Sequence, residues 1–217
     1  MNNGPIVAGP LATHPLATEF ASVVQRVHYR YAREVVGAFS LCPFMNDPAS
    51  AFGRFCVVLD RELAVQPAKE LVLAAPGVVH LIYPLFEGGC HPMERFANAL
   101  HEAVRREVFA RGEGAPPVHA TFHPEMEGDT TTPQRLIGLV RRAPDAFVQF
   151  VPQGLSGGGT QFADLATLDL AALVASPKKG VALAKLTSLE QASLTASARE
   201  IRADRNASYA RYLDAFR

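Results

Sequence analysis

Cys42 and His123 are the residues whose types and neighbours best suit chemistry on a bound molecule. Each stands directly before a proline, Cys42 after a stretch of helical periodicity and His123 at the end of an apolar, β-branched run. A thiolate is a nucleophile, and an imidazole can act as a base, bind an anion or ligate a metal. The alternatives are a cysteine packed between apolar neighbours and a histidine that caps a turn by hydrogen bonds.

Two adjacent arginines, Arg141 and Arg142, lie just before Pro144. Guanidinium groups beside a turn can hold a carboxylate or a phosphate through paired hydrogen bonds. The alternative is a solvated helix end, where cations favour the negative end of the helix dipole.

A metal site would need donors brought together by the fold. Nitrogen and sulfur donors are present at Cys42, His80, Cys90, His91 and His123, but no pair has the CxxC or HxxxH spacing of a local metal-binding element. A metal-binding protein therefore stays an alternative, and the residues indicate no particular cofactor.

The glycine-rich run 154–160 has the position of a phosphate-binding loop, after an expected strand and before an expected helix. However, Thr160 stands where that loop requires lysine. The run also matches the Gly-x-Ser-x-Gly elbow around Ser156, yet every histidine precedes Ser156, whereas hydrolases with this elbow place the histidine after the serine. A flexible connector is the preferred interpretation.

Strands and helices alternate along most of the chain, and this order predicts an α/β or α+β fold. We expect a single-layer sheet of about four strands, covered by helices and followed by extra C-terminal helices. The predicted strands are 54–59, 78–85, 118–122 and 146–151. The predicted helices are 18–39, 67–75, 92–110, 133–140, 162–174 and 188–217.

Composition is that of an ordinary globular protein, with 48% apolar and 19% charged residues. We expect one domain over 17–217, after a disordered leader at 1–16. Because 21 basic residues balance 21 acidic ones, the chain has no general attraction for nucleic acid or anionic membranes. Three cysteines at irregular spacing, no apolar run of about 20 residues and no secretory signal favour the cytoplasm.

Four short segments, in the same order, resemble a bacterial family known as domain of unknown function fourteen-fifteen. They are Leu41-Cys42-Pro43-Phe44, Phe122-His123-Pro124, Arg142-Ala143-Pro144 and Asp204-Arg205-Asn206. The family has a strand histidine where this chain has Gln149. The resemblance implies where a site lies but no reaction, and the missing histidine favours binding over catalysis.

Together these residues predict a pocket for a small anionic metabolite. Arg142, Arg205 and Asn206 would hold the anionic group, His123 would handle a proton, and Cys42 would be a nucleophile or a polar wall. Whether the protein is an enzyme is left open. The alternative is a non-catalytic module whose motifs are structural and whose Ala-rich C-terminal helices bind a partner protein.

Overall fold

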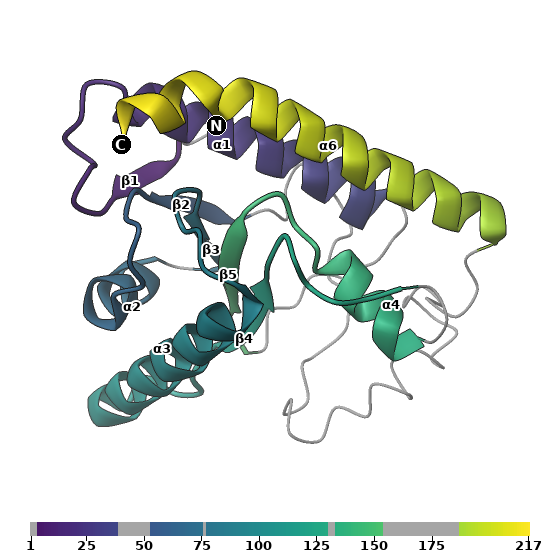
Figure 1. Ribbon diagram of the computed structural model, residues 1–217. Coiled ribbons are helices and arrows are strands. Elements are labelled where there is room, and N and C mark those ends of the chain that lie inside the picture. The colour runs from purple at the N-terminus through teal and green to yellow at the C-terminus, as the bar shows by residue number, and fades with distance from the viewer. Residues whose placement is uncertain (1–3, 39–52, 76, 130–132, 154–186) are drawn as a thin grey trace.

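A five-stranded mixed sheet forms the centre of the protein (Figure 1). The computed structural model describes residues 4–38, 53–75, 77–129, 133–153 and 187–217. The strand order is β1-β2-β3-β5-β4. The strands are β1 (Ile6–Ala8), β2 (Arg54–Val58), β3 (Val79–Tyr83), β4 (Val118–Phe122) and β5 (Ala146–Val151). β1, β2 and β3 are parallel, whereas β5 runs antiparallel to both β3 and β4.

Helices cover both faces of this sheet (Figure 1). On one face α1 (Ala17–Tyr31) and α6 (Ser188–Ala215) lie side by side and antiparallel, and on the other lie α2 (Val65–Leu73) and α3 (Cys90–Arg111). A short helix, α4 (Pro133–Val140), precedes β5. The predicted α/β class is confirmed, with five strands instead of about four. None of the described helices is both long enough and apolar enough to cross a membrane.

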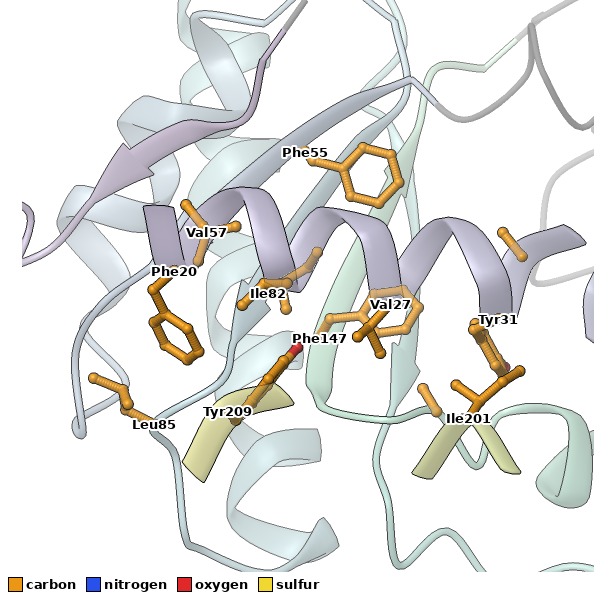
Figure 2. Packing of buried hydrophobic residues seen from close by; sticks show 14 of the residues in the cluster. Phe20, Val27, Tyr31, Phe55, Val57, Ile82, Leu85, Phe147, Ile201 and Tyr209 are labelled. Atoms are coloured by element: carbon orange, nitrogen blue, oxygen red, sulfur yellow. The ribbon is translucent and has the colours of Figure 1, made fainter. Parts of the chain in front are cut away.

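Two apolar clusters hold the layers together, and alternate residues of the strands supply both of them. In β3, Ile82 belongs to the cluster beneath α1 and α6, whereas Leu81 and Tyr83 belong to the cluster beneath α2 and α3. Figure 2 shows Phe20 of α1 and Tyr209 of α6 in the first cluster. Their rings pack edge to face, with the ring centres 5.0 Å apart.

The strand that the sequence did not predict, β1, lies in the stretch that was expected to be a disordered leader. Its Ile6 and Val7 pair with Cys56 and Val57 of β2, so residues 6–8 are part of the sheet. A run of three residues between two Gly-Pro pairs is too short to show strand periodicity, and the pairing partner lies about 50 positions away. The leader expectation is corrected for this segment.

The other predicted elements are found close to their expected bounds. The first helix is α-helical to Tyr31 and continues as a π-helix, η1 (Ala32–Gly37). α6 begins at a capping box, in which the Thr187 side chain accepts from the Glu190 N–H and the Glu190 side chain accepts from the Thr187 N–H. The predicted helix at 162–174 and the glycine-rich run 154–160 lie outside the described residues.

Candidate functional site

The described members of the predicted site lie near one end of the sheet, around the loops that follow β3 and β4. His123 and Arg142 flank the loop after β4, and Arg205 and Asn206 project from α6. Cys42 lies outside the described residues. The predicted contact between Cys42 and the other residues therefore remains a prediction.

His123 uses both ring nitrogens to hold backbone groups. Its Nδ1 accepts from the Glu125 N–H at 3.1 Å, and Nε2 lies 2.9 Å from the Gly88 carbonyl oxygen. A nitrogen that accepts from an N–H carries no proton, so Nε2 is the protonated nitrogen and donates to Gly88. With His123 only 3% exposed, this geometry matches the turn-capping alternative.

Arg142 likewise binds carbonyl oxygens of its own neighbourhood. Nε donates to the Met126 carbonyl at 3.0 Å and Nη2 to the Gly128 carbonyl at 3.2 Å. Arg202 of α6 donates to the Pro124 carbonyl of the same loop at 3.1 Å. Guanidinium groups therefore fix the loop that follows β4.

Arg205 connects α6 to the sheet. Nε donates to Asp145 Oδ1 at 2.9 Å, and Nη2 donates to the Pro84 carbonyl at 3.3 Å. Nη1 donates to Asn206 Oδ1 at 3.2 Å, and the guanidinium lies 4.6 Å from the centre of the Tyr209 ring. Two of the three residues predicted to hold the anionic group, Arg205 and Asn206, thus contact each other. The remaining contacts of the Arg205 guanidinium are with Asp145, Pro84 and Tyr209.

Asp145 is the centre of a buried polar cluster that sequence reasoning missed. Its Oδ2 lies 3.1 Å from His28 Nε2 of α1 and accepts from the Tyr209 hydroxyl at 2.8 Å. Burial alone raises the pKa of Asp145, but the His28 hydrogen bond and the nearby His28 and Arg205 charges outweigh it and leave the pKa below its ordinary value. The sequence signal was a histidine on the apolar face of the first helix and an aspartate directly before an apolar strand.

This cluster is a structural centre and not an accessible site, because Asp145 is 1% and His28 2% exposed. Its three hydrogen-bonding partners come from α1 and α6, and all of them reach the residue that precedes β5. The cluster therefore holds the two helices on the sheet.

Arg141 differs from its neighbour Arg142. Its side chain is half-buried, and no hydrogen-bond acceptor or ion-pair partner contacts its guanidinium among the described residues. Burial lowers the pKa of Arg141, and Tyr31 and Glu94 oppose this effect. A half-buried guanidinium without a protein acceptor is a candidate for binding an anion.

The cysteines that the structure describes are poor nucleophiles. Burial raises the pKa of Cys56 to about 11, and burial and nearby glutamates raise that of Cys90. The thiol is therefore the form present at neutral pH. The described residues include no group of three or more histidine, cysteine, aspartate or glutamate side chains arranged to hold a metal ion.

A pocket of about 370 Å³ opens where β1, β2 and β3 end. Its walls come from the chain after β1 and after β2, from the last residue of β3 and from one side of α2. They include Gly9, Val58, Asp60, Ala68, Leu71 and Tyr83. The carboxyl ends of parallel strands are the usual position of ligand sites in α/β proteins.

Tyr83 lines this pocket, and its hydroxyl has no hydrogen-bond partner in the described part of the chain, although Tyr83 is only 1% exposed. Burial and the Asp60 carboxylate raise the pKa of Tyr83, so the hydroxyl keeps its proton and remains a donor. The Asp60 carboxylate accepts the Glu62 N–H at 2.9 Å. The sequence signal for this pocket was a polar residue, Asp60, directly after a predicted strand.

Comparison with known proteins adds no relative. No family model matches the chain, and neither a curated protein nor a solved structure matches it. The resemblance drawn from the four short segments thus stays a prediction.

Proposed function

We propose that this protein binds a small molecule in the pocket at the carboxyl ends of β1, β2 and β3. The observation that carries the proposal is the buried hydroxyl of Tyr83, a residue of the pocket wall, which has no hydrogen-bond partner among the described residues. A buried donor left unsatisfied costs about 1–3 kcal/mol of folding free energy. A ligand that supplies an acceptor removes this cost on binding.

Position and size support the same proposal. The pocket, at about 370 Å³, falls within the range of about 300–1,000 Å³ that is typical of small-molecule sites. It combines apolar walls, such as Val58 and Leu71, with polar groups at Tyr83 and Asp60. The general expectation of a small-molecule binder is retained here, at a different location from the predicted one.

Tyr83→Phe tests the proposal, because it removes the hydroxyl and preserves the ring. We expect the ligand-free variant to be as stable as the parent or more stable by about 1 kcal/mol, since it loses an unsatisfied donor. In a thermal-shift screen of small metabolites, compounds that stabilise the parent are expected to stabilise Tyr83→Phe less.

Ala64→Trp supplies a second variant, because Ala64 is exposed and lines the pocket. The indole would fill the pocket and abolish the shifts, whereas Leu189→Ala, at an exposed residue on α6, would leave them unchanged. A screen without any stabilising compound would overturn the proposal. Shifts that persist in both Tyr83→Phe and Ala64→Trp would also overturn it.

Arg141 supports a second candidate function, which is the binding of a small anion at this residue, next in the chain to the predicted site residue Arg142. The half-buried guanidinium has no acceptor in the described residues. NMR titration with inorganic phosphate and acetate is expected to show binding that Arg141→Gln removes. Arg106→Gln, at an exposed arginine paired with Glu102, is the matched control. Equal binding by both variants would contradict this candidate.

A further inference from the structure

We infer that the ligand of the β1–β3 pocket carries a cationic amine together with a hydrogen-bond acceptor. This inference rests on the proposed function and specifies the class of molecule. Its basis is the charge and the hydrogen-bonding character of the groups that line the pocket.

Carboxylates supply the charge at the pocket. Asp60 and Glu62 both line it, and none of the described lining residues is a lysine, arginine or histidine. A small carboxylate or phosphate would therefore meet repulsion there, whereas an ammonium group would gain charge-assisted hydrogen bonds.

The cations nearest along the chain have partners outside the residues that line the pocket. Arg61 donates to the Phe216 carbonyl at 3.2 Å, and its guanidinium lies 3.8 Å from Glu87. Lys69, on α2, lies 3.2 Å from Glu107 and 3.3 Å from Glu70. Neither cation is paired with Asp60 or Glu62, so within the part of the chain that the structure describes both carboxylates are available to a cationic ligand.

The buried part of the pocket wall supplies a hydrogen-bond donor. The Tyr83 hydroxyl is a donor, because burial and Asp60 keep it protonated. Ala64, the N-cap of helix α2, and Pro67 of its first turn also line the pocket, but Pro67 carries no N–H, so Tyr83 is the donor on which the inference depends. A hydroxyl or carbonyl oxygen on the ligand would accept from the Tyr83 hydroxyl.

A ligand that matches both the carboxylates and the Tyr83 hydroxyl needs two kinds of group, a cation and a hydrogen-bond acceptor. An amino alcohol or an amino carbonyl compound fits both, with its ammonium at Asp60 and its oxygen at Tyr83. A neutral diol would satisfy Tyr83 alone, and a hydroxy acid would place a carboxylate against Asp60 and Glu62.

Fragment triads that share a hydroxyl-bearing skeleton and differ in one terminal group, an ammonium, a hydroxyl or a carboxylate, provide the test. Ethanolamine, ethylene glycol and glycolate form a small triad, and tyramine, tyrosol and hydroxyphenylacetate a larger one. Binding is measured by NMR titration of the full chain. We expect each amine to bind about tenfold more tightly than its neutral and anionic counterparts, the effect of one charge-assisted hydrogen bond.

Asp60→Asn tests whether the Asp60 charge causes the preference for amines. It is a conservative variant, because the amide oxygen can still accept from the Glu62 N–H. We expect this variant to lose the preference for amines and to keep the weaker binding of the neutral fragments. Asp214→Asn, at an exposed aspartate on α6, is the control that retains the preference.

The outcomes separate the two proposals. Neutral fragments whose binding depends on Tyr83, without any preference for amines, would overturn the ligand class and leave the proposed function standing. A preference for amines that survives both Asp60→Asn and Glu62→Gln would also overturn the ligand class. Absence of binding by every fragment in both triads would count against the pocket itself.

Discussion

The imidazole of His28 and the carboxylate of Asp145 meet inside the protein, with Nε2 3.1 Å from Oδ2, although the residues are 117 positions apart. The side chains are 2% and 0% exposed. Together with Arg205 and Tyr209, this contact makes a single carboxylate the point where α1 and α6 are fixed to the start of β5. One acidic residue thus links both helices to the start of β5, in addition to the apolar cluster beneath them.

Asp145→Asn is expected to lower the free energy of unfolding by about 3 kcal/mol, because it leaves the part-buried Arg205 and the buried His28 without their carboxylate partner. Urea denaturation at neutral pH measures the loss. Asp214→Asn, whose side chain is 71% exposed and pairs with Arg217, serves as the control and should change little. A loss below about 0.5 kcal/mol in Asp145→Asn would contradict the central role of this carboxylate.

Acid should destabilise the protein through carboxylates with lowered pKa values. Hydrogen bonds from Arg26, Arg30 and Ser208 hold the pKa of Asp204 well below its ordinary 3.8, and the pKa of Asp145 is also lowered. The stabilisation from such groups is complete above their unfolded-state pKa and is lost as the pH falls through the lower folded-state pKa. We expect the unfolding free energy to decline below about pH 5.

Asp204→Asn should make this decline shallower, because the variant has no carboxylate to protonate at this position. Urea titrations across the acid range compare the slopes. The exposed-residue variant Asp214→Asn should retain the slope of the parent. Parallel curves for Asp204→Asn and the parent would contradict the role given to Asp204.

Gly9 is required by the backbone at the end of β1. Its φ is +97°, and a Cβ atom there would lie 2.8 Å from the Leu59 carbonyl oxygen. We expect Gly9→Ala to cost about 2 kcal/mol in thermal unfolding. Gly112→Ala, with φ +67° but open space, should cost about 1 kcal/mol, and Gly4→Ala, without either constraint, should be nearly neutral. Equal effects at all three positions would contradict this explanation.

Arg142→Gln distinguishes the loop-fixing role from the predicted ligand-binding role. Loss of the guanidinium frees the Met126 and Gly128 carbonyls, so amide hydrogen exchange at 123–129 should accelerate with little change in global stability. Arg106→Gln is the surface control. Unchanged exchange in this loop, combined with weaker binding of an anion, would instead favour the ligand-binding role.

Much of the fold could be predicted because its elements have clear local signals. Alternating apolar and β-branched runs marked β2 to β5, and helical periodicity marked α1 and α3. β1 was missed since three residues carry little periodicity, and their strand character appears only when β2 is present as a partner. The strand order also depends on such long-range pairing.

The candidate site was less predictable, for a physical reason. Residue type indicates that His123 and Arg142 can bind a ligand, but their donors and acceptors are used by backbone groups that the sequence does not place. Conversely, the sequence around Tyr83 predicts an apolar strand residue. Only the three-dimensional arrangement shows that its hydroxyl has no hydrogen-bond partner among the described residues. Satisfaction of hydrogen bonds is a property of the tertiary structure.

The strand order places β1 and β4 at the two edges of the sheet, and prolines stand at or near both ends of each strand. Pro5 and Pro10 bracket β1, while Pro117 and Pro124 bracket β4. Proline has no N–H to offer a further strand, so backbone pairing at either edge of the described sheet is interrupted at these positions. The prolines that end these strands therefore shorten the edges open to pairing with a second molecule.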